Sequence, residues 1–294
     1  MPLPSQGGAM EGLIVFGDSL CDGGNAHALR GDAAVPCPPH WRGRRCNGPV
    51  WVEQLATRLG LPPLVHSLAG GSNHAYGGAR SGPGFSPKGM PNLLEQVEKF
   101  LGGEAWAAAD PLVVIRAGAN DYLDAAPGPA VAAAVNGHLL AAVEALAAAG
   151  LRRFLVPTEL PWGFSPIELP GVLEADRLAL NALIGRQNSE LQAALGGLAA
   201  ERQLELVQPD FHGLFMAVRA DPAAFGFNEI HRPVLQSDSS GLAIAVSPGA
   251  ALGDAVAASG YLWWDNWAHL TTAFHGLLAD RALAALRTAE LGEC

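Results

Sequence analysis

The chain has 294 residues, of which 49% are hydrophobic and 16% are charged, so it can bury a sizeable core and lacks the composition of a disordered protein. Its 18 Lys and Arg against 28 Asp and Glu give a formal charge of −10. This balance argues against nucleic-acid binding, which needs basic patches, and it disfavours binding to anionic membranes.

The chain begins without a recognisable targeting signal. Residues 1–8 contain no basic residue and no apolar stretch of signal-peptide length, which predicts a cytoplasmic protein. The most Ala- and Leu-rich segment, residues 131–150, is interrupted by Asn136, His138 and Glu144. It therefore predicts an amphipathic helix, and we expect no transmembrane segment.

Short apolar runs alternate with longer helical patterns from residue 13 onward. Apolar runs of four or five residues with little alternation are typical of parallel strands that helices cover on both faces. The alternation predicts an α/β fold with a central, mainly parallel sheet. Strands are predicted at residues 13–16, 64–68, 112–115, 153–156 and 204–207, and helices at 50–59, 93–101, 129–149, 172–199 and 272–287.

The helix predicted at residues 93–101 divides into two faces. Its apolar side chains lie on one face, and Glu95, Gln96, Glu98 and Lys99 lie on the opposite face. We expect these four polar residues to face water.

No internal repeat, linker or charge block divides the chain. We therefore expect one domain over residues 1–294. Two segments rich in Gly and Pro, at about residues 21–47 and 228–252, predict long loops. Long loops in α/β proteins commonly frame a binding site, and we expect these two to do so.

The four cysteines are too sparse for a disulfide scaffold. Cys21, Cys37, Cys46 and Cys294 are expected to be free thiols, with a Cys37–Cys46 bridge as the alternative. Cys37, His40 and Cys46 supply part of a possible zinc site, but their spacing lacks the short paired steps of zinc motifs and no fourth ligand follows. We expect neither a metal nor another cofactor.

Residues 16–20, Phe-Gly-Asp-Ser-Leu, end the first predicted strand and place Ser19 at its carboxyl end. Open α/β sheets bind their ligands at this edge, and a hydroxyl nucleophile there is suited to covalent catalysis. The other interpretation is that Ser19 only caps a following helix. Residues later in the chain favour the catalytic role.

A candidate base and acid lie near the C-terminus. Asp265 is placed to orient the imidazole of His269, and His269 to take the proton of the serine. His275 is the rival base, but it falls within a predicted helix, where a packed histidine is the commoner case. The neighbouring Trp263, Trp264 and Trp267 are expected in the core and the pocket wall.

Candidate oxyanion donors come from three separate segments. The backbone N–H groups of Ser19 and Gly78 and the side-chain amide of Asn120 can together stabilise the negative charge of a tetrahedral acyl intermediate. The alternative is that Gly78 only forms a turn and Asn120 only caps a helix.

Four blocks of the sequence resemble the GDSL lipase/esterase family, the SGNH hydrolases, and in particular its larger lipolytic acylhydrolase-like members. The blocks cover residues 16–25, 47–52, 75–79 and 118–121, and further similarity lies at residues 160–163 and 221–227. The resemblance implies a three-layer α/β/α sandwich of flavodoxin-like type and hydrolysis of acyl esters. It also implies that Ser19, Gly78, Asn120 and His269 are the four residues after which the family is named.

The acid departs from the family's pattern. Family members place it three residues before the histidine and a proline after the histidine, whereas here Asp265 precedes His269 by four positions and Leu270 follows. Either the loop bulges so that Asp265 still reaches the imidazole, or a backbone carbonyl near Asn266 orients His269.

Arg116 is unusual because it lies in a strand otherwise built from Val, Ile and Leu. A buried guanidinium needs a partner. Arg116 therefore pairs with an acid such as Asp18 or Asp121, which we favour, or it binds an anionic group of the substrate.

These features predict a serine esterase or lipase that forms an acyl-enzyme on Ser19 and acts on a small-molecule or lipid ester. An α/β-hydrolase fold is disfavoured because residues 17–21 lack the second Gly of the Gly-x-Ser-x-Gly turn. Two alternatives stay open: an acyltransferase on the same site, and a binding protein of the same fold that has lost catalysis.

Overall fold

The computed structural model describes residues 11–103, 110–124, 127–167, 173–237, 244–246 and 259–292. The predictions for residues 1–8 and for Cys294, and about half of the loop predicted at residues 228–252, lie outside this part of the chain.

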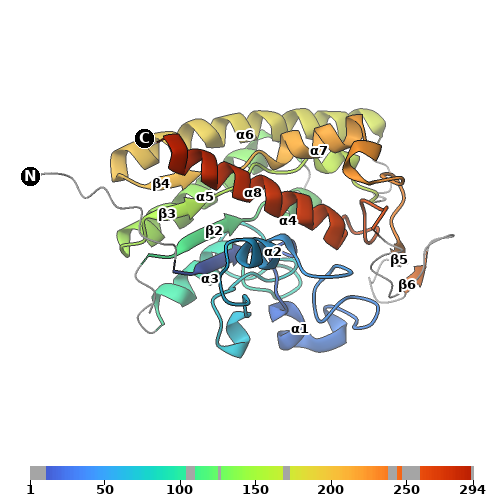
Figure 1. The fold of residues 1–294 in the computed structure, drawn as a ribbon, viewed down its shortest axis with the longest axis horizontal. Coiled ribbons are helices and arrows are strands. Elements are labelled where there is room, and N and C mark those ends of the chain that lie inside the picture. Colours follow the sequence, from blue (N-terminus) through green and yellow to red (C-terminus); the bar gives the residue numbers. More distant parts are fainter. Residues whose placement is uncertain are drawn as a thin grey trace, which may run out of the picture.

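The centre of the protein is a sheet of four parallel strands (Figure 1). In chain order, β1 (Leu13–Gly17), β2 (Leu112–Arg116), β3 (Arg153–Leu155) and β4 (Glu205–Val207) lie side by side. Leu13 of β1 is opposite Leu112 of β2, which in turn is opposite Arg153 of β3. Every residue of β1 and β2 is buried, as aliphatic strands covered on both faces require. The predicted parallel sheet is confirmed.

The strand predicted at residues 64–68 is wrong. Val65 and Leu68 are exposed, and the segment ends in a short 3-10 turn, η2 (Ser67–Ala69). Residues 72–76 run beside β1 instead: the Val15 N–H donates to Ser72 at 3.0 Å, and the His74 N–H donates to Val15 at 2.7 Å. The prediction failed because this apolar run leads into a turn. The polar residues after the turn, and not the apolar run, pair with β1 at the edge of the sheet.

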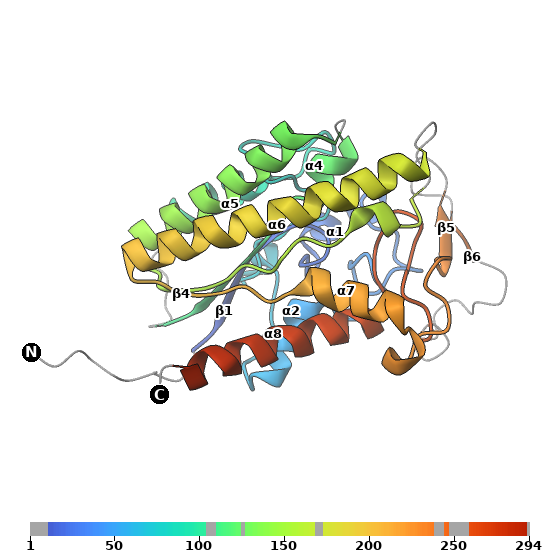
Figure 2. The same ribbon diagram turned by 90° about the horizontal axis from the view of Figure 1, so that it is seen from above.

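Helices cover both faces of the sheet (Figure 2). Side chains of β1 alternate between two cores, since Ile14 and Phe16 join one and Leu13 and Val15 join the other. The architecture is the predicted three-layer α/β/α sandwich. The first core is covered by α3 (Leu93–Leu101), α5 (Pro129–Ala148) and part of α6 (Glu174–Arg202), and the second by α2 (Trp51–Arg58), α7 (Phe211–Ala220) and α8 (Thr272–Gly292).

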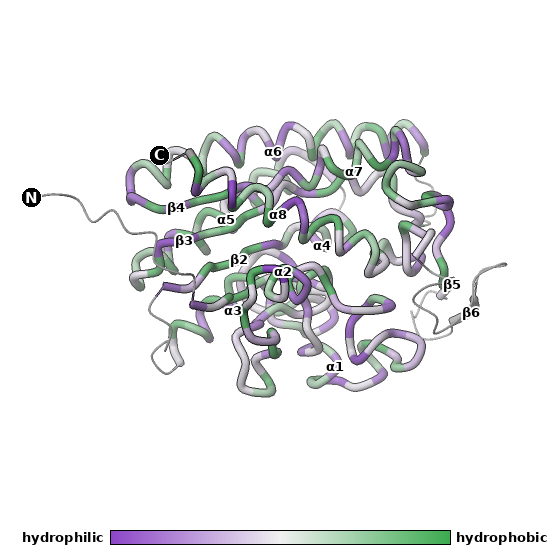
Figure 3. The backbone as a smooth tube through the Cα atoms, in the orientation of Figure 1, coloured by the Kyte–Doolittle hydropathy of each residue, from purple (hydrophilic) through white to green (hydrophobic). Residues whose placement is uncertain are grey.

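Within the described ranges, α5 is the one helix long and apolar enough to cross a membrane. Its large apolar residues Val135, Leu139, Val143 and Leu146 recur at helical spacing and are buried in the core beside the sheet. Figure 3 shows β2 as mainly hydrophobic, in contrast to the more mixed colouring of α6. This buried face shows that α5 is a helix of the protein core.

The irregular segments contain short elements that the sequence did not predict. Residues 21–47 include the helix α1 (Asn25–Arg30), and residues after β2 form α4 (Ala119–Asp124). The described part of the second loop contains β5 (Leu235–Ser237), which pairs antiparallel with β6 (Ile244–Val246). These elements are too short for their periodicity to be recognised in a sequence.

Three of the cysteines are free thiols, as predicted: Cys21, Cys37 and Cys46. Cys21 and Cys46 are fully buried, and burial raises the pKa of both thiols. The Nδ1 atom of His40 accepts the indole N–H of Trp264 at 2.9 Å. Among the described residues, no three His, Cys, Asp or Glu side chains gather as metal ligands.

Candidate active site

Ser19 lies in a tight turn directly after β1. The carbonyl of Asp18 accepts the N–H groups of Cys21 and Asp22, both at 3.0 Å, and the Asp18 carboxylate accepts the N–H of Leu20 at 3.0 Å. Helix α1 begins only at Asn25, so Ser19 does not cap it. The turn raises the serine hydroxyl above the carboxyl end of the sheet.

The structure brings Ser19, His269 and Asp265 together from opposite ends of the chain. The Nε2 atom of His269 is 3.1 Å from Ser19 Oγ. Its Nδ1 atom is 2.8 Å from both carboxylate oxygens of Asp265. With the Nδ1 proton held by the carboxylate, Nε2 is left as the acceptor that faces the serine hydroxyl.

Of the two arrangements that the four-residue spacing allowed, the structure has the bulged loop. Ala268 takes a left-handed conformation with φ +68° and absorbs the extra residue. Asp265 Oδ1 also accepts the backbone N–H groups of Trp267 at 3.0 Å and His269 at 3.2 Å. The carboxylate, and not a backbone carbonyl near Asn266, therefore holds the imidazole.

Asp265 is completely buried behind the histidine. Burial by itself raises the pKa of a carboxyl group, but the charge and hydrogen bond of His269 outweigh burial and hold this pKa below its ordinary value. The loop is supported from behind by β5, since Leu235 accepts the N–H of Asn266 at 3.2 Å and donates to Trp264 at 2.8 Å. Asp265 is thus a fixed anion.

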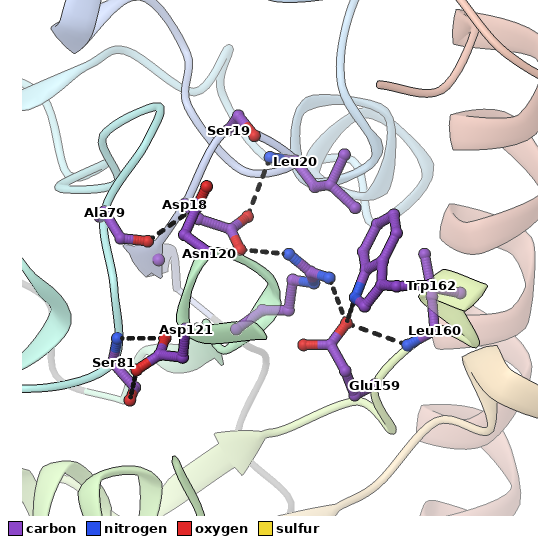
Figure 4. A network of polar contacts seen from close by, with 12 residues as sticks. Asp18, Ser19, Leu20, Ala79, Ser81, Asn120, Asp121, Glu159, Leu160 and Trp162 are labelled. Atoms are coloured by element: carbon purple, nitrogen blue, oxygen red, sulfur yellow. Dashed lines mark hydrogen bonds and ion pairs between the residues drawn. The ribbon is translucent and has the colours of Figure 1, made fainter. Parts of the chain in front are cut away.

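Gly78 and Asn120 lie beside Ser19, as their positions in the sequence suggested. In the described part of the chain, the N–H groups of Ser19 and Gly78 have no hydrogen-bond acceptor. The Asn120 amide donates one hydrogen to the carbonyl of Ala79 at 2.9 Å, which leaves its second hydrogen for a ligand (Figure 4). All three residues line the same cavity, so donors from three segments are available to a ligand beside the serine hydroxyl.

Two features favour glycine at position 78. Its φ of +83° is one that other residues rarely adopt, and a Cβ there would lie 3.2 Å from the side chain of Lys88. Gly77, by contrast, donates its N–H to Asp22 at 2.8 Å and is not available to a ligand.

Arg116 is buried and pairs with two carboxylates, those of Asp18 and Glu159 (Figure 4). The prediction that it pairs with an acid is correct, although Asp121 is not its partner: Asp121 instead accepts the N–H and hydroxyl of Ser81. Burial alone lowers the pKa of Arg116, but the two carboxylates outweigh it and raise that pKa. This ion cluster lies directly beneath the turn that carries Ser19.

Sequence reasoning missed several residues that hold the site in place. Gln96 was expected to face water, but it is buried and brackets Gly17, accepting its N–H at 2.8 Å and donating to its carbonyl at 2.9 Å. Asp22 joins the nucleophile turn to Gly77. Glu159 accepts from Arg116 and from the Trp162 indole at 2.8 Å. The sequence does not show that such a polar residue is buried unless its partner, which is distant in the chain, is known.

The rival base, His275, is fully buried in α8 and serves another element. Its Nδ1 accepts the N–H of Trp51 at 3.1 Å, one of the groups at the start of α2 that has no acceptor within its own helix. Burial lowers the pKa of His275 to about 3. His275 is therefore a neutral packing residue.

This burial predicts an acid-sensitive fold. Below pH 6.5 the unfolded chain binds a proton at His275 that the folded protein does not, so the free energy of unfolding falls by about 1.4 kcal/mol per pH unit down to the folded pKa. His275→Gln, measured by urea denaturation from pH 7 to pH 5, should make this slope shallower by about that amount. Equal slopes in the two proteins would contradict the assignment.

A cavity of about 340 Å³ opens beside Ser19 and His269. Its walls are mainly apolar, and Trp267 is the tryptophan of the C-terminal group that lines it, whereas Trp263 and Trp264 are buried in the cores. This volume lies at the small end of the range for small-molecule sites, roughly 300–1,000 Å³. Its apolar lining residues are Leu20, Ala26, Ala33, Ala34, Val35, Met90, Ala119, Leu123, Trp162, Trp267 and Ala268.

Comparison with known proteins gives several relatives. A phosphatidylcholine-sterol acyltransferase of Aeromonas hydrophila is 34% identical over 116 residues, covering 39% of this chain and 34% of that protein. A thermolabile hemolysin of Vibrio parahaemolyticus is 26% identical over 286 residues, covering 92% of this chain and 62% of that protein. A solved structure, an alpha/beta hydrolase enzyme from the metagenome of Lake Arreo, Spain, is 14% identical, with 94% and 95% of the two chains covered and a TM-score of 0.46.

The chain thus spans about a third and about two thirds of the length of these two curated relatives. A family model described as GDSL-like Lipase/Acylhydrolase matches residues 13–282, which is most of the sequence and includes Ser19, Asn120 and His269. The chain belongs to the GDSL-like lipase/acylhydrolase family.

Proposed function

We propose that the protein is a serine esterase that hydrolyses carboxylic acyl esters through an acyl-enzyme on Ser19. The observation that carries the proposal is the continuous chain of contacts from Ser19 Oγ to His269 Nε2 at 3.1 Å and from His269 Nδ1 to Asp265 at 2.8 Å. A serine hydroxyl needs such a base to become a nucleophile, and the base needs a group that fixes its tautomer.

In the first half of the reaction, Ser19 Oγ attacks the ester carbonyl carbon while its proton moves to His269 Nε2. A C–O bond forms, and the carbonyl π electrons move to the oxygen. The tetrahedral intermediate then collapses, the bond to the alcohol breaks, and His269 gives its proton to the departing alcohol. The buried Asp265 carboxylate stabilises the imidazolium between these two steps.

In the second half, water replaces the alcohol. His269 takes a proton from the water while the oxygen of the water attacks the acyl carbon. The second tetrahedral intermediate then releases the carboxylic acid, and His269 returns the proton to Ser19 Oγ. In both halves the negative oxygen is stabilised by the N–H groups of Ser19 and Gly78 and by the Asn120 amide.

The role of Asn120 gives a prediction about catalysis. Asn120→Ala removes one oxyanion donor and should lower kcat about 10²–10³-fold with little change in KM, because the donor acts mainly on the transition state. Steady-state hydrolysis of a p-nitrophenyl ester measures both constants. Asn136→Ala, which removes an amide that donates to the carbonyl of Gln187 outside the cavity lining, is the matched control. An unchanged kcat in Asn120→Ala would remove Asn120 from the oxyanion site.

Labelling with a fluorophosphonate probe tests the proposal directly. The wild type should form a covalent adduct that mass spectrometry locates on Ser19, and it should hydrolyse p-nitrophenyl esters from acetate to palmitate with a chain-length optimum that reports the cavity. Ser19→Ala should lose both properties. A folded wild type that neither labels nor hydrolyses any of these esters would favour the binding-protein alternative.

An acyltransferase on the same site is the second candidate, favoured by the apolar cavity walls and by the sterol acyltransferase among the relatives. It differs only in whether water or another alcohol accepts the acyl group. Product analysis with an added alcohol separates the two. A transferase gives mostly the new ester at low alcohol concentration, whereas an esterase gives mostly the acid.

A further inference from the structure

The charges around the cavity do not follow the composition of the chain. The protein has more acidic than basic residues, 28 against 18, yet the residues that line the cavity include four cations, Arg30, Arg45, Lys88 and Arg116. Among the described residues, no Asp or Glu is part of the lining. The charged side chains at the cavity wall are therefore all basic although the protein is acidic, and such a lining attracts anions.

The four cations are not equivalent. Arg116 is compensated by the buried carboxylates of Asp18 and Glu159, so it contributes little net charge to the cavity. The chain of Lys88 covers Gly78, and its ammonium group lies 5.6 Å from the centre of the Trp267 ring. We therefore do not expect Arg116 or Lys88 to be the main binding group for an anionic ligand.

Arg30 and Arg45 differ from Arg116 because no carboxylate in the described ranges lies within ion-pair distance of either guanidinium. The charge of Arg45 does act on the buried carboxylate of Asp265, whose pKa it helps to lower. Both come from the segment at residues 21–47. Arg30 ends α1 and packs against Gly89, while the half-buried Arg45 donates to the carbonyl of Ala34, which fixes its guanidinium beside the cavity. A guanidinium presents five donors, so each retains several for a ligand.

We propose that the cavity takes esters that carry an anionic group, a carboxylate or a phosphate, and that Arg45 and Arg30 bind this group. The inference rests on the proposed function, because it places the ester of the same molecule at Ser19. The planar guanidinium matches both kinds of oxyanion, and a hydrogen bond between charged groups is stronger in a partly enclosed cavity than in water. The anion then fixes the position of the ester relative to Ser19.

Matched pairs of esters test the proposal and distinguish which end of the substrate carries the charge. For the acyl side, kcat/KM of mono-p-nitrophenyl succinate is compared with that of p-nitrophenyl butyrate. For the alcohol side, butyryl glycerophosphate is compared with monobutyrin. We expect the anionic member of one pair to be favoured about tenfold or more.

The same pairs are measured with Arg45→Gln, Arg30→Gln and the control Arg42→Gln. Arg42 lies in the same segment and is exposed, as Arg30 is, but it lies outside the cavity lining, so the control removes the same charge elsewhere. The preference should fall toward one in Arg45→Gln and decrease in Arg30→Gln, and it should persist in Arg42→Gln.

The outcomes separate this proposal from the proposed function. Hydrolysis of neutral esters that depends on Ser19 but shows no preference for the anionic member of either pair would overturn the anion site alone. A preference that falls equally in Arg42→Gln would also overturn it, because the effect would then come from overall charge. Absence of Ser19-dependent hydrolysis of all four esters would overturn the proposed function and this inference with it.

Discussion

Replacing Asp265 with Asn should lower kcat for ester hydrolysis by about 10⁴-fold while the protein stays folded. Asn can keep the hydrogen bonds from the backbone of Trp267 and His269, which Asp265 Oδ1 accepts at 3.0 and 3.2 Å. Its amide can also donate to the imidazole, which favours the tautomer with the proton on Nε2. That tautomer cannot take the proton of Ser19, and the imidazolium has lost its counter-charge.

Single-turnover and steady-state kinetics on a p-nitrophenyl ester measure the loss, and urea denaturation checks the fold. Asp280→Asn is the matched control, since it removes a carboxylate that is 60% exposed and pairs with Arg58. The control should retain full activity. A loss of less than about tenfold in Asp265→Asn would mean that another group orients His269.

Replacing Arg116 with Met should lower the free energy of unfolding by about 3–5 kcal/mol. The change leaves the carboxylates of Asp18 and Glu159 buried beside each other without a cation. Burial already raises the pKa of Glu159, because water no longer stabilises its charge and Arg116 offsets this only in part. Without the guanidinium, both carboxylates face a larger desolvation cost and mutual repulsion.

Urea denaturation at pH 7 gives the magnitude, with Arg58→Met as the control. Arg58 forms its ion pair with Asp280 at the surface, where such pairs contribute about 0–1 kcal/mol. Adding Glu159→Gln to Arg116→Met should recover part of the lost stability by removing one unpaired charge. A similar small loss in both single variants would show that the buried cluster is not a structural ion network.

Local sequence patterns predicted most of the strands of the sheet and most of the helices that pack on its two faces. The runs that form β1 and β2 are apolar at nearly every position, and only a strand with helices on both faces buries such a run completely. The failure at residues 64–68 has the same origin, because hydrophobicity alone does not distinguish a strand from an apolar run that leads into a turn.

The candidate site was also predictable only in part. Ser19, Gly78, Asn120 and His269 stand out because nucleophile, donor and base are residue types with particular chemistry, placed after strands or near a helix start. The connection between Asp265 and His269 did not follow from spacing. It depends on the left-handed conformation of Ala268, which a sequence does not specify for a non-glycine residue.

Periodicity and side-chain chemistry were enough to predict the α/β class of the fold, the chain positions of the four sheet strands and the types of residue that form the candidate site. The pairing of the polar groups became known from the folded protein alone. Gln96 with Gly17, Glu159 with Arg116, and Arg45 beside the cavity each depend on segments far apart in the chain. Burial makes such pairing obligatory, but the partner is chosen by how the layers pack.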